Sequence, residues 1–345
     1  MSNTPSQAPI GTAKRPSKPK GRRYFQYMRP QMHVVYATLP LMAAGVYLFG
    51  WRVIGLWVFV TVLGLIAEGA FTLPKRKPIT SACLVTSTLY TLTLPPTIPF
   101  WMAGVGILFG LILGKMAFGG TGMNVFNPAL SGRAFIYVCF PVEMTNRWVD
   151  PAVGPMAGFQ EWISGTLQPD AVSTATPLAM IKDNVPFDWL KAFMGYTAGS
   201  IGETSAILIL LGGLWIVFGS KSASWRIIVA TLAGFLVSNV LFFFADLLPP
   251  SASPLDWIVA GGFLFGAVFM ATDPVSAANT KGGQWIYGVL IGVLTVVFRG
   301  FSNFPEGTMF AILMGNIFAP TFDYLIKERQ KKKKALAAGS KGGGV

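Results

Sequence analysis

The chain has 345 residues, of which 52% are hydrophobic and only 12% are charged. Soluble domains carry about 25% charged residues, so this composition excludes a soluble one- or two-domain enzyme, and it also excludes a disordered or collagen-like chain. The mean hydropathy is +0.55 and the net charge is +13. In a chain this apolar, an excess of Lys and Arg is typical of cytoplasmic loops and tails. We therefore predict contact with a lipid membrane and no nucleic-acid partner.

Cysteine and histidine are scarce. The two cysteines, Cys83 and Cys139, lie inside apolar segments, no CxxC motif is present, and His33 is the single histidine. The chain therefore cannot supply the four thiolates of an iron–sulfur cluster, and it leaves little room for a zinc site or a His-based triad. Redox or hydrolytic chemistry would need a cofactor or a partner, and we predict no catalytic residue in the chain itself.

Apolar segments long enough to cross a membrane as helices recur along the chain. We predict an all-α integral membrane protein with about ten transmembrane helices, the fifth and ninth short, over residues 31–50, 53–73, 79–97, 100–117, 128–142, 202–219, 226–247, 256–271, 284–299 and 308–326. The first apolar segment is too long for a cleaved signal peptide, so we expect it to be retained as an anchor.

The predicted helices fall into two five-helix halves, residues 31–142 and 202–326, separated by a polar outer segment, 143–201. Basic tails flank them at 1–30 and 327–345. If the N-terminus is inside, most Lys and Arg fall in inner turns and tails, including Lys115, whereas most acidic residues fall outside. The positive-inside rule therefore predicts that both termini are cytoplasmic.

A glycine- and asparagine-rich turn precedes the fifth helix, in the run FGGTGMNVFNPALSGRAF (118–135). Asn124 and Asn127 lie three residues apart, and Pro128 suits the first turn of a helix. Two carboxamides beside the free N–H groups of a helix entrance suit a planar heteroaromatic ligand with imide edges. The other interpretation is an inner turn that caps a membrane helix. The glycines do not form a P-loop, because no GK[ST] follows.

A second motif, DAVSTATPL (170–178), lies in the outer segment. Taken alone it reads as ordinary loop sequence. The hydroxyl of Thr176 is a poor nucleophile, but it could accept an activated phosphate supplied by a separate enzyme.

Acidic residues in or beside apolar segments form a third group, in which Asp273 and Asp323 stand out. Ionisable groups at membrane depth usually mark ion or proton routes. Asp273 precedes a proline in MATDPVSA, and a carboxylate with freed carbonyls and hydroxyls suits a hard cation. Asp before Pro is equally typical of a helix cap.

These motifs, together with GSIGETS (199–205), MATDPVSAANTKGG (270–283) and FPEGTMFAILMGNIFAPTFDYLI (304–326), resemble one family in the same order along the chain. This is the family of the B subunit of the sodium-translocating NADH:quinone oxidoreductase (Nqr), which also contains the D subunit of the Rnf electron-transport complex. The resemblance extends over about residues 30–330 and implies ten transmembrane helices in a multi-pass protein of the bacterial inner membrane.

The resemblance also implies two flavins. FMN would be joined through a phosphoester to Thr176, with Asp170 and Ser173 in register with the family motif, after attachment by a flavin transferase. Riboflavin would lie near the inner face against Asn124 and Asn127.

The resemblance further implies that Asp273 and Asp323 handle sodium. A third acidic residue of the family, near the entrance of the third helix, falls close to Ser81 here and is absent. This departure favours an Rnf-like set of partners or another ion.

The resulting hypothesis is a membrane component of an Nqr-type complex, which carries electrons from covalent FMN to riboflavin and on to quinone and couples them to Na+ translocation. The D subunit of an Rnf-type, ferredoxin-linked complex is the alternative within the family. A secondary transporter without a redox role, or a scaffold that anchors redox partners, are alternatives of other classes.

Overall fold

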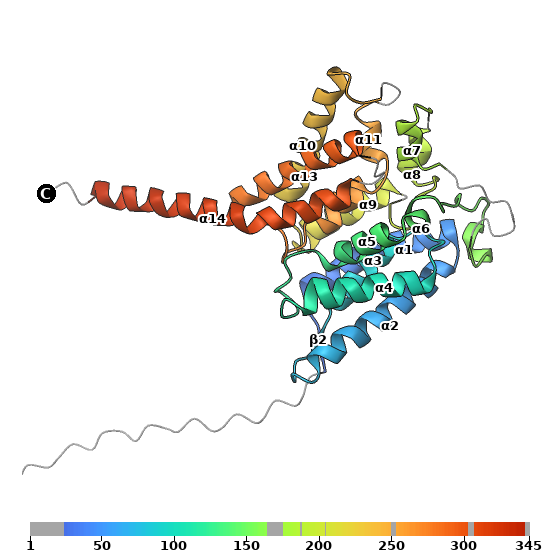
Figure 1. Ribbon diagram of the computed structural model, residues 1–345, viewed down its shortest axis with the longest axis horizontal. Helices are drawn as coiled ribbons and strands as arrows, with labels where there is room; N and C mark the ends of the chain where they lie inside the picture. The colour runs from blue at the N-terminus through green and yellow to red at the C-terminus, as the bar shows by residue number, and fades with distance from the viewer. Residues whose placement is uncertain are drawn as a thin grey trace, which may run out of the picture.

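The computed structural model describes residues 24–163, 175–186, 188–203, 205–249, 253–302 and 307–341. Helices dominate this part of the chain (Figure 1). The first group is α1 (Arg29–Phe49), α2 (Arg52–Thr72), α3 (Ala82–Leu92), α4 (Phe100–Leu111) with the π-helical turn η1 (Ile112–Met116), and α5 (Pro128–Cys139). The second group is α9 (Ala206–Leu214) with η3 (Trp215–Gly219), α10 (Trp225–Phe244), α11 (Asp256–Val259), α12 (Phe263–Phe265) with η4 (Gly266–Met270), α13 (Lys281–Phe301) and α14 (Thr308–Lys341).

Within the described part of the chain, five helices are long and apolar enough to cross a membrane by length and composition, namely α1, α2, α10, α13 and α14. Shorter apolar helices lie at 82–92, 100–116 and 206–219. A mostly helical membrane fold is thus confirmed, whereas the number of crossings and the side on which the termini lie stay predictions. The ninth predicted segment is longer than expected, because Thr280 caps α13 and the helix then continues for 21 residues despite Gly282 and Gly283.

Two of the predicted spans are much shorter as helices than their apolar segments. Within 79–97, α3 has only 11 residues, because the run Leu94-Pro95-Pro96 cannot continue it. Within 256–271, the chain breaks at Gly261, whose φ of +65° favours glycine, and helix resumes only at Phe263. Apolarity marks the extent of such segments but does not reveal where the helix inside them ends.

The backbone groups at these helix ends find partners from other parts of the chain. The carbonyls of Leu92 and Leu94 accept from the N–H groups of Gly202 and Ile201 at 2.7 and 3.1 Å. Arg299 of α13 donates to the carbonyl of Ala260 at 2.8 Å, just after α11. Since lipid offers no hydrogen bonds, a broken helix is tolerated only where protein satisfies its ends.

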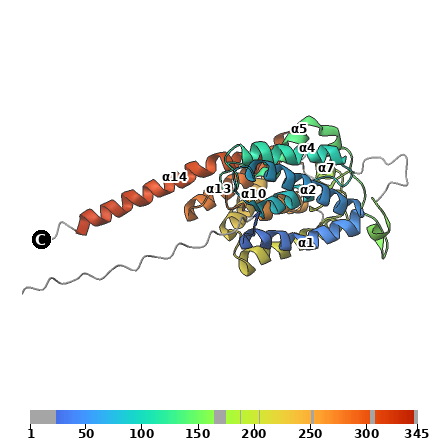
Figure 2. The same cartoon turned by 90° about the horizontal axis from the view of Figure 1, so that it is seen from below.

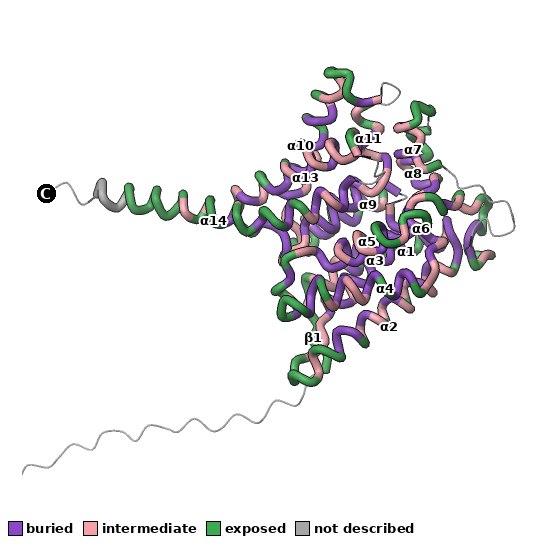
Figure 3. Tube along the Cα trace, viewed as in Figure 1, coloured by how far each residue is buried: buried purple, intermediate pink, exposed green. Residues whose placement is uncertain are grey.

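The helices form two packed groups. Contacts lie mainly within α1 to α5 and within α9 to α14, and the groups meet where α1 packs on α9 and α5 packs on α14. Figures 1 and 2 show the long helices lying side by side around a shared interior, which Figure 3 shows as buried.

The two ends of this bundle differ. One end carries β1 (Phe25–Gln26), which pairs in parallel with β2 (Ile79–Thr80), together with the start of α1. We call it the inner end. At the opposite, outer end lie α6 (Pro141–Thr145), the 3-10 turn η2 (Ala157–Gln160), α7 (Pro177–Lys182) and α8 (Trp189–Met194). Figure 1 also shows α14 extending past the bundle on the inner side, and the helix crosses residue 327, where we predict the basic tail to begin, without a break.

Glycines allow α10 and α13 to pack with their backbones in contact. A Cβ built on Gly292 would lie 2.4 Å from both the backbone N of Phe235 and the carbonyl oxygen of Thr231. One built on Gly234 would lie 2.7 Å from the carbonyl oxygen of Val289. Small residues at such crossings let membrane helices pack closely.

The substitution Gly292→Ala is therefore expected to destabilise the protein. The added methyl would push α10 away from α13, and overpacking of this kind costs about 1–3 kcal/mol. Thermal unfolding of the detergent-purified protein should show a lower midpoint. The matched control is Gly199→Ala, because nothing lies within 4 Å of a Cβ there. Equal midpoints for both variants would contradict the close crossing.

Candidate functional site

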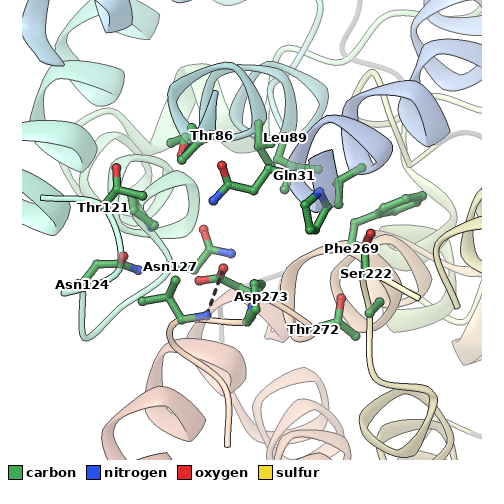
Figure 4. Close-up of a pocket in the computed structure, with 18 of the residues that line it drawn as sticks. Gln31, Thr86, Leu89, Thr121, Asn124, Asn127, Ser222, Phe269, Thr272 and Asp273 are labelled. Carbon is green, nitrogen blue, oxygen red and sulfur yellow. Dashed lines mark hydrogen bonds between the residues drawn. The ribbon is translucent and has the colours of Figure 1, made fainter. Parts of the chain in front are cut away.

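A cavity of about 750 Å³, part of it open to solvent, lies at the inner end between the two helix groups. Figure 4 shows its polar side chains converging from different elements. The lining residues that matter below are Gln31, Thr86, Lys115, Thr121, Asn124, Asn127, Ser222, Phe269, Thr272 and Asp273. Two π-helical turns contribute Lys115 and Phe269, and such turns are frequent at functional sites.

Asn127 holds together two helix ends beside this cavity. Its Oδ1 accepts from the N–H groups of Ala129 and Leu130 at 3.0 and 3.4 Å, so it caps α5. Its Nδ2 donates to the carbonyl of Met270, the last residue of η4, at 3.3 Å. The capping interpretation of this asparagine is therefore correct as geometry, and the side chain stays within reach of the cavity.

Asn124 lies on the same side of the cavity. Its Nδ2 donates to the carbonyl of Phe126 at 2.9 Å, and its Oδ1 remains an acceptor. The N-x-x-N spacing thus brings both carboxamides to one cavity. Phe269 adds an aromatic face to the same lining.

Asp273 also lines this cavity, in the segment that joins η4 to α13. Its carboxylate accepts from the hydroxyl and the N–H of Ser276 at 2.7 and 3.3 Å and from the N–H of Val275 at 3.5 Å. The carboxylate therefore caps its own turn and also faces a cavity, and the ion route stays a prediction. The sequence could not have placed it beside Asn127, which lies in the other half of the chain.

Asp323 lies on the far side of the same segment. Its two carboxylate oxygens accept from the N–H groups of Asn279 and Thr280, both at 2.8 Å, and from the Thr280 hydroxyl at 2.7 Å. It holds the start of α13 and lines a separate open groove with Asn124 and Ser276. Of the two predicted sodium residues, Asp273 thus lies within the segment 271–280 and Asp323 binds the end of that segment, and they line different cavities.

Cation ligands are sparse around both carboxylates. Among the described residues, no three His, Cys, Asp or Glu side chains gather as a metal site. A sodium ion bound here would depend on one carboxylate together with hydroxyl and carbonyl oxygens, which are suitable ligands for hard cations.

A buried ion pair forms part of the cavity wall. Lys115 donates to Glu68 at 2.7 Å, and the exposed fractions of their side chains are 2% and 0%. Glu68 also accepts from the N–H and hydroxyl of Thr80, and that hydroxyl lies 2.8 Å from the hydroxyl of Thr121. The charge pattern used above to predict the orientation treats Lys115 as a solvated charge in an inner turn. In the structure its side chain is buried instead. Its position at the end of an apolar run gave no sign of a buried partner.

Ser81, where the family resemblance would place a third acidic residue, is fully buried. Its hydroxyl accepts from the N–H of Met28 at 3.0 Å. A carboxylate nevertheless lies beside this entrance of α3, because Glu68 of α2 bonds to the preceding residue, Thr80. Sequence position alone could not show that a residue of another helix occupies this place.

Thr176 lies at the outer end, remote from the cavity. It caps α7, where its Oγ1 accepts from the N–H of Ala179 at 3.3 Å, and it is half-buried. Asp170 and Ser173 lie outside the described residues. Lys182 at the end of α7 donates to the carbonyl of Ser302 at 3.2 Å, which ties α7 to α13. Burial lowers the pKa of Lys182, and the nearby Arg299 lowers it further.

A second buried pair lies toward the outer end. Arg133 of α5 donates to Glu203 at 3.2 Å and to the hydroxyl of Ser200 at 3.3 Å. A Cβ on Gly262 would lie 2.2 Å from a carboxylate oxygen of Glu203, so this glycine makes room for the pair. The pair joins α5 of the first helix group to the residues that precede α9, and the sequence gave no indication of the pairing.

Comparison with known proteins places this arrangement in a family. Residues 15–332 match the family model described as NQR2, RnfD, RnfE. The chain belongs to this family. The resemblance found from the motifs is thereby confirmed.

Members of the NQR2, RnfD, RnfE family with curated names include three similar proteins, each named as the B subunit of the Na(+)-translocating NADH-quinone reductase. The Klebsiella pneumoniae subsp. pneumoniae protein is 41% identical over 286 residues, which cover 81% of this chain and 67% of the relative. The Azotobacter vinelandii protein is 41% identical over 282 residues, 79% of this chain and 66% of the relative. The Neisseria meningitidis serogroup B protein is 41% identical over 289 residues, 82% and 69%. With its long apolar helices, the chain is a multi-pass bacterial membrane protein.

Breaking the Glu68–Lys115 pair is expected to destabilise the protein strongly. The substitution Lys115→Met leaves a buried carboxylate without its cation, at a cost of about 3–5 kcal/mol. The double variant Glu68→Gln/Lys115→Met removes both charges and should recover most of this loss. Thermal unfolding of the three proteins compares them directly. A double variant no more stable than Lys115→Met would show that the pair is not what stabilises this wall.

Proposed function

We propose that this chain is the B-type subunit of a sodium-translocating NADH:quinone oxidoreductase in the bacterial inner membrane, where it carries electrons from FMN on Thr176 to riboflavin in the inner cavity and on to quinone. The relatives described above, which are named as B subunits of the Na(+)-translocating NADH-quinone reductase, support membership in this type of complex. The observation that supports the role is the cavity, which brings Asn124 and Asn127 of one helix group beside Asp273 of the other.

The residues present fit a flavin in the inner cavity. The cavity joins an aromatic face at Phe269 with amide and hydroxyl groups at Gln31, Asn124 and Thr121. A planar ring with an apolar face and a polar edge needs this combination. Flavins bound by the chain would supply the electron transfer, while the protein supplies their position and tunes their electronic environment.

Thr176 fits an attachment point because of its place and exposure. Its Oγ1 accepts one long hydrogen bond, from Ala179, and it lies half-buried at the outer end, where a separate flavin transferase could reach it. The end remote from the basic tails is the one that the charge pattern predicts to be outside. The chain's part in this step is to hold the hydroxyl on α7, which Lys182 ties to α13.

Coupling to sodium would depend on Asp273. Its carboxylate faces the cavity and can hold a cation together with the Ser276 hydroxyl, while the backbone around it is fixed by the turn. A negative charge beside a redox site responds to the charge of that site, so cation affinity and flavin reduction become linked. Asp323 would act from the other side of the segment by holding Asn279 and Thr280.

The D subunit of an Rnf-type complex remains the alternative within the family. The three relatives at 41% identity, which are named as B subunits of the quinone reductase, favour the Nqr type. A secondary transporter without a redox role is the alternative of another class, and the broken segments α3 and α12 with η4 would suit it. The variant Thr176→Ala separates a transporter from a flavoprotein.

Thr176→Ala is expected to abolish covalently bound flavin, because it removes the hydroxyl that would form the phosphoester, while the fold stays intact. The chain is produced with and without a flavin transferase and run on denaturing gels, and flavin fluorescence is read under ultraviolet light. Thr145→Ala, another threonine of the outer segment, is the control and should stay fluorescent. A dark wild-type band with an active transferase would point to the transporter.

Asp273→Asn is expected to raise the sodium concentration for half-maximal NADH-quinone activity roughly tenfold, which corresponds to about 1.4 kcal/mol of lost cation affinity. The carboxamide keeps an acceptor for Ser276, so flavin content should stay close to wild type. Asp188→Asn is the control, since Asp188 also caps a short helix but lies at the outer end. Unchanged sodium kinetics in Asp273→Asn would remove this residue from the ion path.

A further inference from the structure

A buried asparagine on α14 joins the parts of the chain that surround the inner cavity. Asn316 is fully buried. Its Oδ1 accepts from the N–H of Asn127 at 3.3 Å. Its Nδ2 donates to the hydroxyl of Tyr287 at 3.0 Å and to the carbonyl of Ser276 at 3.4 Å. One side chain therefore connects the start of α5, the segment 271–280 and α13.

This connection continues to Asp273 through Ser276. Ser276 donates its hydroxyl and N–H to the Asp273 carboxylate and offers its carbonyl to Asn316. Two residues, Ser276 and Asn316, thus connect Asp273 to Asn127 through hydrogen bonds. Buried polar groups need hydrogen-bond partners. If the segment 271–280 shifts, Asn316 must therefore move with it or lose its hydrogen bond to Ser276.

We propose that Asn316 is a positioning residue that couples the flavin cavity to the cation site, by fixing Asn127 and the Asp273 segment in one arrangement. The proposal rests on the function proposed above. Asn316 touches neither ligand itself. It sets the distance between the residues that hold them, so that a change at Asp273 is felt at Asn127.

A purely structural role would be redundant at this place. The segment 271–280 is held independently by Asp323, which accepts from Asn279 and Thr280, and α5 is capped by the side chain of Asn127 itself. The loss of Asn316 should therefore leave both elements folded but uncoupled. This difference makes the proposal testable in a folded protein.

The experiment uses the whole purified complex with Asn316→Leu, which keeps the side chain's approximate volume and removes its hydrogen bonds. Riboflavin released by denaturation is measured relative to covalent FMN, and the half-saturating Na+ concentration is measured from activity. We expect the riboflavin:FMN ratio to fall and the half-saturating concentration to rise, each by at least about fivefold, which is the effect of losing a single neutral hydrogen bond. Covalent FMN reports that the chain is folded.

Two further variants distinguish the loss of these hydrogen bonds from a general effect of replacing a buried polar residue. Tyr287→Phe removes only one partner of Asn316 and should change both quantities in the same direction by less. Asn239→Leu is the matched control, because Asn239 is also fully buried but its side chain has no hydrogen-bond partner within the described residues. It should leave both quantities unchanged. If Asn316→Leu does not accumulate, Tyr287→Phe carries the test.

The double variant Asn316→Leu/Asp273→Asn decides between coupling and simple loss of packing. If Asn316 acts through the Asp273 segment, the two effects on sodium half-saturation will be non-additive. Additive effects, or unchanged values in Asn316→Leu with riboflavin present in the wild type, would overturn the coupling alone. Absence of riboflavin from the wild-type complex would instead overturn the proposed function.

Discussion

Every helix that ends inside this bundle must have its free backbone groups satisfied by protein, and the site depends on how this is done. The last carbonyl of η4, at Met270, is met by the side chain of Asn127, which at the same time caps α5. Two helix ends from different halves of the chain therefore meet through one carboxamide. Because lipid offers no alternative partner, this junction is fixed, and the cavity forms beside it.

Buried charged side chains likewise find their partners within the protein, at both ends of the molecule. Lys115 and Glu68 pair in the wall of the inner cavity, and Arg133 and Glu203 pair toward the outer end. Buried pairs of this kind fix geometry more than they add stability, since desolvation offsets much of their attraction. Asp273 differs from them, because it lies at a cavity and its carboxylate bonds to no Lys or Arg among the residues that the structure describes. We therefore propose it as the carboxylate that responds to a mobile ion.

The sequence predicted what is local or periodic, and it missed what depends on distant contacts. The apolar segments, the family and the caps at Asn127 and Asp273 follow from composition, motif and turn chemistry. The short length of α3 and of α12 with η4 does not, because hydropathy continues across their breaks. Nor could the sequence show that Lys115 is buried, since its partner Glu68 lies on another helix. The position of Asn316 between Asn127 and Ser276 likewise depends on three elements meeting in space.

The most direct test of this account is an electron cryo-microscopy structure of the purified complex that contains the chain. We predict planar density in the inner cavity, against Phe269 and within reach of Asn124 and Asn127, and density continuous with the Oγ1 of Thr176 at the outer end. A cavity filled by lipid or water, together with an unmodified Thr176, would contradict the account.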